Sequence, residues 1–273
     1  MKPEPFPFSV VIPCFNEEDR LARAIERLTS WAPSFATRLE IVFVDDGSAD
    51  STLRVLKDYA ATDPRVRVVE QPHVGAMHAL IGGYRAADGA FVGNMEADCA
   101  AGPEEFDRLV AFLSDYDVVV GSRQLRGDLG PILEKKIPRR ILSWGMSRLF
   151  TSLFSCGVRD PQIGFKVFKS GVLKQVVPHL KSSHDGIKAA ESVVVAHALG
   201  YRVKEVPIRY CHDERSRLVP KWPHRVVWGV MVALLRMWID SYLEYRKGTF
   251  VNCPVRGTLL LEGLIKTGLV HSR

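Results

Sequence analysis

The sequence lacks several features that mark particular classes of protein. It contains only 5 cysteines in 273 residues, and no two of them form a C-x-x-C pair. A disulfide framework and a structural zinc site are therefore not expected, and the composition favours a reducing compartment. Residues 1–7 contain no apolar segment, so no secretory signal is expected. The longest apolar run, 226–239, is too short to span about 30 Å of hydrocarbon as a helix.

Glycine-rich phosphate-binding turns are also missing. The first apolar segment is followed by Pro13-Cys14-Phe15-Asn16 rather than by a glycine turn, and no G-x-x-x-x-G-K-[ST] segment occurs. These absences argue against a dinucleotide dehydrogenase. The composition is otherwise that of an ordinary globular protein, with a formal net charge of +6. This charge indicates an anionic partner without choosing among nucleic acid, phospholipid headgroup and sugar nucleotide.

Apolar strands and amphipathic helices alternate along the first half of the chain. Continuous apolar strands separated by helices are typical of a parallel sheet that is covered on both faces. The fold class is therefore α/β, and the first ~120 residues are expected to form a nucleotide-binding half. The predicted strands are 8–15, 40–44, 66–69, 90–95 and 118–120, and the predicted helices are 17–31, 51–61, 76–87 and 103–113.

The alternation breaks down after Gly121. Residues 123–140 are basic and are interrupted by glycine and proline, which predicts a long loop. The last residues, 250–273, show no clear register. Between these segments we expect helices at 141–154 and 189–199, strands at 164–168 and 201–210, and a Trp-rich segment at 222–245.

Carboxylates follow two of the predicted strands. Asp45-Asp46-Gly47-Ser48 ends one strand, and Glu96-Ala97-Asp98 ends another. Ligands of parallel sheets bind at the carboxyl ends of the strands, where such side chains can accept hydrogen bonds from ribose or base or hold a hard cation. Each segment taken alone is equally compatible with a loop cap or a solvated turn.

Taken together and in order, these segments resemble the family 2 glycosyltransferases of GT-A fold. The first four are V-V-I-P-C-F-N-E-E (10–18), V-D-D-G-S-A-D-S-T (44–52), E-A-D (96–98) and V-G-S-R (120–123). Two later segments, D-P-Q-I-G-F-K-V-F (160–168) and K-E-V-P-I-R-Y (204–210), look like those of polyprenyl-phosphate sugar synthases, including the dolichyl-phosphate mannose and glucose synthases and their bacterial relatives.

The resemblance implies a Rossmann-like, mostly parallel sheet flanked by helices, with a C-terminal helical extension. Residues 1–218 would form the glycosyltransferase domain, with a nucleotide-binding half (1–121) and an acceptor half (122–218). A helical extension (219–249) and a tail of unknown structure (250–273) would follow. Phe165 and Phe168, inside the D-P-Q-I-G-F-K-V-F segment, are better explained as core residues than as site residues.

The resemblance also implies a reaction and its ligands. A hexose would move from a nucleotide diphosphate-sugar, UDP or GDP, to the phosphate of a polyprenyl lipid such as dolichol or undecaprenol, with inversion at the anomeric carbon. Mg²⁺ or Mn²⁺ would stabilise the leaving diphosphate, and no nucleic-acid partner is expected. The metal ligands would be Glu96, Asp98 and Gln162. The residues lining the nucleotide pocket would be Pro13, Asn16, Glu17, Asp45 and Asp46.

A basic acceptor site is expected because the acceptor phosphate is already anionic and needs no strong base. Arginine suits phosphate, since its planar fork donates two hydrogen bonds at once. By the resemblance, Arg123, Arg139 and Ser143 contact the acceptor phosphate, and the catalytic set is Asp98, Arg123, Gln162 and Glu191. The segment Arg215, Ser216 and Arg217 resembles a basic loop that closes over the diphosphate.

The sequence also departs from the family pattern. Glu96 replaces the usual aspartate of the metal motif, Ala100 replaces a polar residue, and Ala76 stands where a lysine is usual. Of an acidic pair, only Glu191 is kept, because Ala189 replaces the other member. Two alternatives therefore stay open: transfer to a glycan or small-molecule hydroxyl with Glu191 as base, and a sugar-nucleotide-binding relative without turnover.

The Trp-rich segment raises the question of a membrane surface. Aromatic and cationic side chains interleave there, as is usual at the headgroup boundary, although packing on the catalytic domain explains them equally well. We expect a cytoplasmic protein, with peripheral association with the membrane as a hypothesis. The sequence specifies neither the sugar, the nucleotide, the lipid length nor the oligomeric state. The aromatic residues are Trp222, Trp228, Trp238, Tyr242 and Tyr245.

Overall fold

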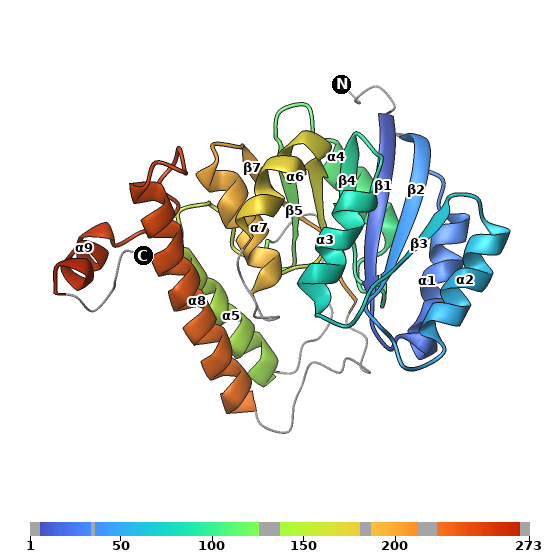
Figure 1. Cartoon of the computed structure of the whole chain (residues 1–273), viewed down its shortest axis with the longest axis horizontal. Helices are drawn as coiled ribbons and strands as arrows, with labels where there is room; N and C mark the ends of the chain where they lie inside the picture. The colour runs from blue at the N-terminus through green and yellow to red at the C-terminus, as the bar shows by residue number, and fades with distance from the viewer. Residues whose placement is uncertain (1–5, 34–35, 126–136, 181–186, 212–222, 268–273) are drawn as a thin grey trace.

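The computed structural model describes residues 6–33, 36–125, 137–180, 187–211 and 223–267. Its centre is one mixed sheet with the strand order β3-β2-β1-β4-β6-β5-β7 (Figure 1). The predicted α/β architecture is confirmed. The strands are β1 (Phe6–Cys14), β2 (Ala36–Asp45), β3 (Val66–Glu70), β4 (Phe91–Asn94), β5 (Val118–Ser122), β6 (Lys166–Lys169) and β7 (Val203–Pro207).

The direction of the strands determines which residues share an edge. β1 lies between β2 and β4 and is parallel to both, so the three strands end at the same edge of the sheet. β6 is antiparallel to β4 and β5, and Lys166 at its start is in register with Asn94 and Val120 near the ends of those strands. The carboxyl edge therefore collects the ends of the parallel strands and the beginning of β6.

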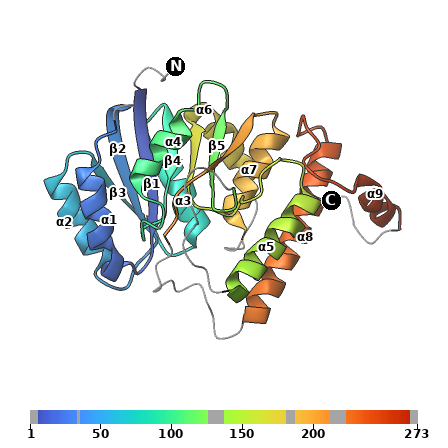
Figure 2. The ribbon, with the colours of Figure 1, turned by 180° about the vertical axis from the view of Figure 1, so that it is seen from behind.

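Helices cover both faces of the sheet. Figure 1 shows α3, α6 and α7 on the face toward the viewer, and Figure 2 shows α1, α2 and α4 on the opposite face. This two-sided cover explains why the strands are almost continuously apolar. The helices of these layers are α1 (Glu18–Ser30), α2 (Thr52–Thr62), α3 (Ala76–Ala86), α4 (Phe106–Val110), α6 (Ser170–Val176) and α7 (Lys188–Ala198).

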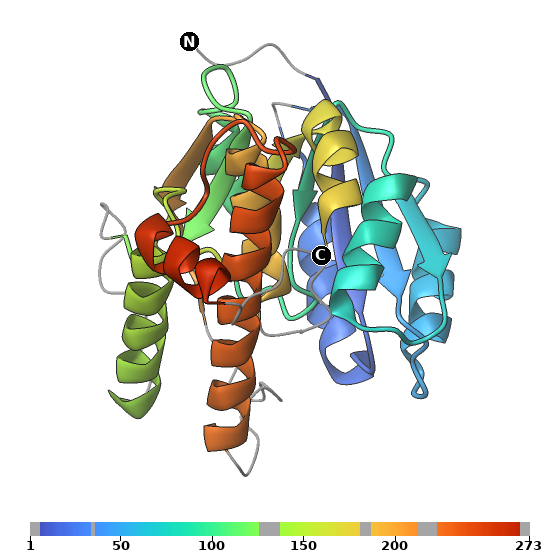
Figure 3. The same ribbon diagram turned by 60° about the vertical axis from the view of Figure 1, so that its left-hand side comes forward.

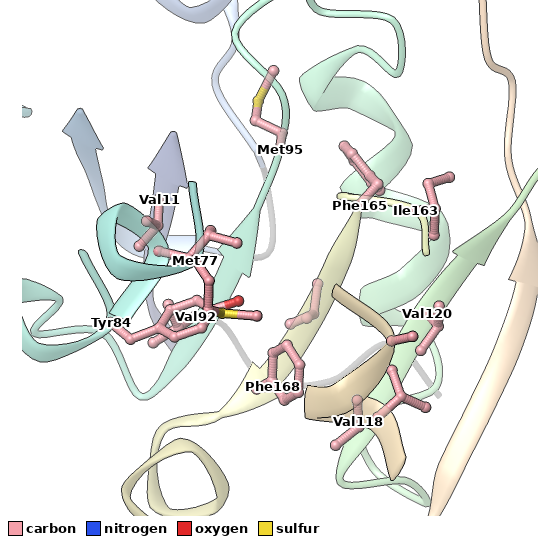
Figure 4. Packing of buried hydrophobic residues seen from close by; sticks show 14 of the residues in the cluster. Val11, Met77, Tyr84, Val92, Met95, Val118, Val120, Ile163, Phe165 and Phe168 are labelled. Atoms are coloured by element: carbon pink, nitrogen blue, oxygen red, sulfur yellow. The ribbon is translucent and has the colours of Figure 1, made fainter. Parts of the chain in front are cut away.

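Aromatic side chains fill the core behind the carboxyl edge. Phe106 stacks on Phe165 with ring centroids 4.2 Å apart, and its edge meets Phe8 at 5.3 Å. Phe165 and Phe168 are 2% and 0% exposed, so their expected place in the core is confirmed. Figure 4 shows Phe165 and Ile163 on the side of the core that faces Met95, next to the loop after β4.

Some boundaries differ from those expected. The segment predicted as a loop up to residue 140 already becomes helical at 137, where α5 (Ile137–Leu153) begins, and Pro138 suits a first helical turn. The helix predicted at 103–113 is a 3₁₀ turn (Pro103–Glu105) followed by the short α4. Residues 126–136 of the expected loop lie outside the described residues.

The sequence predicted the two C-terminal helices only in part. The Trp-rich segment forms α8 (Pro223–Arg246), and the tail without clear register contains α9 (Thr258–Lys266). Trp238 and Tyr242, two of the proposed membrane-facing aromatics, are buried and bond to Arg256 O at 2.9 Å and Glu262 Oε1 at 3.0 Å. For these two residues the membrane hypothesis is wrong, because Trp238 packs against the chain that leads into α9 and Tyr242 bonds to α9 itself.

The N-terminal parts of α5 and α8 extend beyond the carboxyl edge of the sheet (Figures 1 and 3). Trp144 on α5 and Trp228 on α8 are 58% and 67% exposed. Among the described residues, no helix is both long enough and apolar enough to cross a bilayer. Trp222 lies outside the described residues.

Candidate active site

The turn after β1 is tied to the loop after β2. Asn16 has a left-handed φ of 54°, a conformation that asparagine tolerates better than most residues. Its Oδ1 accepts a hydrogen bond from Ala49 N at 2.8 Å, and its own N–H donates to Ser48 Oγ at 3.0 Å. The two loops predicted to bind the nucleotide therefore form one unit, with Pro13 partly buried at the end of β1.

Asp45 and Asp46 are both 2% exposed, but their carboxylates serve different partners. Asp46 Oδ2 accepts from Gly75 N at 2.9 Å and lies 2.8 Å from His73 Nδ1, so it anchors the loop before α3. Asp45 Oδ2 accepts from Ser48 N at 3.1 Å, whereas Oδ1 is buried without a hydrogen-bond partner among the described residues. Leaving such an oxygen unsatisfied costs about 1–3 kcal/mol. The role of Asp45 as a nucleotide contact stays a prediction.

The loop after β4 carries two neighbouring carboxylates. Glu96 Oε2 accepts a hydrogen bond from the Tyr210 hydroxyl at 2.7 Å. Asp98 Oδ1 accepts from Ala100 N at 2.9 Å, and its Oδ2 lies 3.9 Å from an Arg20 guanidinium nitrogen. Burial raises the pKa of Glu96, and the negative charge of Asp98 raises it further. The same Arg20 pairs with Glu17 at 2.5 Å, which brings Glu17 to this end of the site.

Arg123, directly after β5, is held by Asp160 through two parallel contacts. Nε lies 2.8 Å from Oδ2, and Nη2 lies 2.7 Å from Oδ1. Asp160 is itself fixed, because its N–H donates to Glu205 Oε1 at 2.8 Å. Burial disfavours the charged form of Arg123, but the hydrogen bonds with Asp160 outweigh it and raise the pKa above its ordinary value. The predicted acceptor arginine is therefore a fixed cation at this edge.

The turn that carries Gln162 packs against Glu96. A Cβ on Gly164 would lie 2.9 Å from Glu96 Cγ, so the close approach depends on glycine at this position. Asn94 Nδ2 donates to the Gly164 carbonyl, and Asn94 Oδ1 accepts from the Tyr84 hydroxyl at 3.1 Å. Gln162 itself is partly buried. The structure thus brings the predicted Gln162 segment into the same region as Glu96.

Two buried residues at this edge, Tyr210 and Lys166, were not predicted as site residues. The Arg123 guanidinium lies 5.2 Å from the centroid of the Tyr210 ring. Lys166 is 1% exposed and donates from Nζ to the Ile163 carbonyl. Burial lowers the pKa of Lys166 to about 7, although nearby carboxylates oppose this change. The sequence did contain a signal for Lys166, because a lysine inside the apolar run G-F-K-V-F is unusual.

Of the remaining predicted site residues, only Glu191 has a side chain within the described part of the chain. Glu191 is 6% exposed in the first turn of α7. Its role as a base stays a prediction. The side chains of Arg139 and Ser143, near the start of α5, lie outside the described residues, as do Arg215, Ser216 and Arg217.

The donor set can be compared with what a divalent cation requires. No group of three or more His, Cys, Asp or Glu side chains in the described part of the chain is arranged to hold a metal ion. Mg²⁺, however, is usually bound by one or two carboxylates together with substrate phosphates. Glu96 and Asp98 supply hard oxygen donors on one loop, with Asp98 partly exposed. These residues therefore fit a cation that a diphosphate helps to coordinate.

Comparison with known proteins identifies the family. A family model described as glycosyl transferase family 2 matches residues 9–176, which is more than half of the chain. The chain belongs to glycosyl transferase family 2. As a family 2 member it is a glycosyltransferase, and the enzyme class expected from the ordered motifs is confirmed.

Similar family members include transferases named for polyprenyl phosphates. The dodecaprenyl-phosphate galacturonate synthase of Rhizobium johnstonii is 28% identical, over 94% of this chain and 74% of that protein. The undecaprenyl-phosphate 4-deoxy-4-formamido-L-arabinose transferase of Edwardsiella ictaluri is 30% identical, over 76% of this chain and 61% of its own length.

A solved structure supports the fold. The glucosyl-3-phosphoglycerate synthase of Mycobacterium tuberculosis, crystallised with Mn²⁺, UDP and glucosyl-3-phosphoglycerate, superimposes with a TM-score of 0.58. The match covers 85% of this chain and 80% of that one at 19% identity, so it shows the fold alone. The expected GT-A fold of this family 2 member is confirmed.

Proposed function

We propose that this glycosyltransferase moves a hexose from a nucleotide diphosphate-sugar to a polyprenyl phosphate, with inversion and with bound Mg²⁺ or Mn²⁺. The observation that carries the proposal is Arg123, a fixed cation within one cluster with Tyr210 and Glu96. Asp160 uses Nε and Nη2 of Arg123, which leaves Nη1 for a phosphate oxygen. The names of the relatives support the same acceptor.

The donor would lie across the ends of β1, β2 and β4. The unsatisfied Oδ1 of Asp45 would accept a hydrogen bond from the base or ribose. Glu96, Asp98 and Gln162 would hold the cation. That cation, when bound, neutralises the charge that develops on the departing diphosphate.

The acceptor half would act mainly by positioning. Arg123 binds and orients the acceptor phosphate, whose oxygen is deprotonated at neutral pH because its second pKa is about 6. No side chain then needs to remove a proton. An oxygen that enters from the side opposite the diphosphate would invert the anomeric carbon.

We also propose peripheral association with the cytoplasmic face of a membrane, where a polyprenyl acceptor would reside. Trp144 on α5 and Trp228 on α8 are exposed, and the N-terminal parts of these two helices extend past the site edge (Figure 3). Tryptophan favours the headgroup region of a bilayer, and the Arg148 guanidinium lies 5.0 Å from the Trp144 ring. The same orientation would bring the carboxyl edge toward the lipid phosphate.

Sugar transfer by the purified protein tests the proposal. Radiolabelled UDP-glucose, UDP-galactose, UDP-N-acetylglucosamine and GDP-mannose would each be supplied with polyprenyl phosphate and Mg²⁺ or Mn²⁺. We expect one donor to give a labelled product in organic solvent, dependent on metal and lost in Asp98→Asn. Nucleotide binding without any lipid product would favour a hydroxyl acceptor or a non-catalytic relative instead.

A further inference from the structure

Tyr210 connects two residues that the proposed function uses separately. Its hydroxyl donates to Glu96 Oε2 at 2.7 Å, and its ring lies beneath the Arg123 guanidinium, 5.2 Å from the centroid. Tyr210 is only 6% exposed. It therefore contacts one residue of the metal motif and the acceptor arginine at the same time.

The backbone on both sides of Tyr210 is fixed to the segment that follows β4. Cys211 N donates to Ala100 O at 2.7 Å, and Arg209 N donates to Glu105 Oε2 at 3.2 Å. Tyr210 therefore cannot shift without moving the loop that carries the two carboxylates. Such a rigid attachment is what a group needs if it is to orient another side chain.

Glu96 is held from two sides. Glycine at position 164 leaves room for the methylene groups of Glu96, since a Cβ there would lie 2.9 Å from Glu96 Cγ. On the other side, the Tyr210 hydroxyl donates a hydrogen bond to Oε2 of the Glu96 carboxylate. Glutamate has one more rotatable bond than aspartate, and ordering that bond costs free energy each time a ligand binds. The hydrogen bond from Tyr210 fixes this additional bond of Glu96 before a ligand binds, and it leaves Oε1 for another partner.

We propose, resting on the function proposed above, that Tyr210 is a positioning residue for sugar transfer. Its hydroxyl orients the longer Glu96 carboxylate toward a divalent cation, and its ring positions Arg123 for the acceptor phosphate. Glutamate at position 96 and tyrosine at position 210 thus work as a pair, because an aspartate at position 96 would be one methylene too short to keep the same hydrogen bond.

The first test is Tyr210→Phe, which removes only the hydroxyl. Mn²⁺ binding would be titrated by electron paramagnetic resonance with UDP present, and with GDP in a parallel series. A hydrogen bond to a charged group is worth enough for about a tenfold effect, so we expect about tenfold weaker Mn²⁺ binding and about tenfold lower kcat. The nucleotide-sugar KM should change little. Tyr242→Phe, which removes the bond to Glu262 at 3.0 Å, is the matched control and should leave both quantities unchanged.

The pairing itself is tested by Glu96→Asp in the native and Tyr210→Phe backgrounds. If the two residues act together, losing the hydroxyl should weaken Mn²⁺ binding far less once Glu96→Asp is present. Additive effects would overturn the proposal. So would a Tyr210→Phe protein that melts at a lower temperature but keeps native Mn²⁺ binding and kcat, because that result would show a purely structural role.

The Arg123 contact is tested by Tyr210→Leu, which also removes the ring. We expect the KM for polyprenyl phosphate to rise above that of Tyr210→Phe by a few-fold, the size of a partly buried cation–π contact. Equal acceptor KM values would overturn this part. The Mn²⁺ titration needs no turnover, so native Mn²⁺ binding without sugar transfer would reject the proposed function alone. A native protein that binds no Mn²⁺ would overturn the role of Tyr210.

Discussion

Neighbouring residues of one type can have very different roles, as Asp45 and Asp46 illustrate. The sequence D-D-G-S indicates two carboxylates at a strand end but not which one faces a ligand. Only the structure shows that Asp46 is occupied by Gly75 and His73, while Asp45 keeps a buried oxygen without a partner among the described residues. The contact between Arg123 and Asp160 is similarly invisible in sequence, because the two residues are far apart in the chain.

The Asp63–Arg65 pair makes stability depend on pH. Hydrogen bonds from Arg65, at 2.7 Å for Nη2 to Oδ2, lower the pKa of Asp63 from 3.8 to about 2. A lowered carboxyl pKa adds stability that is present above the unfolded value and is lost as the pH falls through the folded value. Between pH 5 and pH 2 the native protein should therefore lose roughly 1–2 kcal/mol more unfolding free energy than Asp63→Asn.

Urea unfolding at a series of pH values measures this difference. Asp58→Asn changes an exposed aspartate on α2, the helix that Asp63 follows; it is the control and should follow the native curve. Parallel curves for the native protein and Asp63→Asn would contradict the assignment.

At the scale of elements, α3 packs closely against the sheet because it carries a glycine. A Cβ on Gly83 would lie 2.2 Å from Val11 Cγ1 and 3.0 Å from Val44 Cγ2. Gly171 in α6 has no heavy atom within 4 Å of such a Cβ. Gly83→Ala should lower the free energy of unfolding by about 1–3 kcal/mol through overpacking, whereas Gly171→Ala should raise it by up to about 1 kcal/mol.

Thermal melts of the two alanine variants compare them directly. We expect the melting temperature to fall for Gly83→Ala and to stay level or rise for Gly171→Ala. Equal changes in both would show that α3 can move away from β1 without cost.

Hydrophobic periodicity was enough to predict most of the elements in residues 1–121. The strand through Val10 and the strand through Val42 are buried on both faces, which produces an unbroken apolar signal. The sequence does not reveal that β6 runs antiparallel to its neighbours, because strand direction depends on how the chain folds back onto the sheet. The tail was missed for another reason: in α9 only Leu261 is fully buried, while Leu259 and Leu260 are exposed, so its pattern is weak.

On the scale of the whole molecule, α5 and α8 each carry an exposed tryptophan, and the N-terminal parts of both helices extend beyond the carboxyl edge (Figure 3). If Trp144 and Trp228 meet the headgroup region, the protein should co-float with anionic liposomes, and a Trp144→Ser, Trp228→Ser variant should lose most of the floated fraction. Val251→Ser, Leu259→Ser removes similarly exposed apolar side chains elsewhere and is the control. Flotation that is equal for both double variants would contradict this orientation.

The proposed donor and acceptor residues lie at the ends of different strands along one edge of the sheet. The β1, β2 and β4 ends carry the residues proposed for the donor, and the β5 and β7 ends carry Arg123 and Tyr210. Sequence motifs indicated the donor residues and Arg123, which lie at or just after the ends of apolar strands, but they did not indicate Tyr210. The links between them, through Tyr210 and through Gly164 beside Glu96, depend on how the strands are ordered and could not be read from spacing.

The most direct test of the account compares two acceptors that differ only in the phosphate. The purified protein, supplied with its active labelled donor and metal, would receive either polyprenyl phosphate or the polyprenol of the same chain length. Because Arg123 is proposed to bind an anionic oxygen that needs no base, labelled lipid should form with the phosphate and not with the alcohol. Comparable transfer to the alcohol, or transfer to the phosphate that persists unchanged in Arg123→Met, would contradict it.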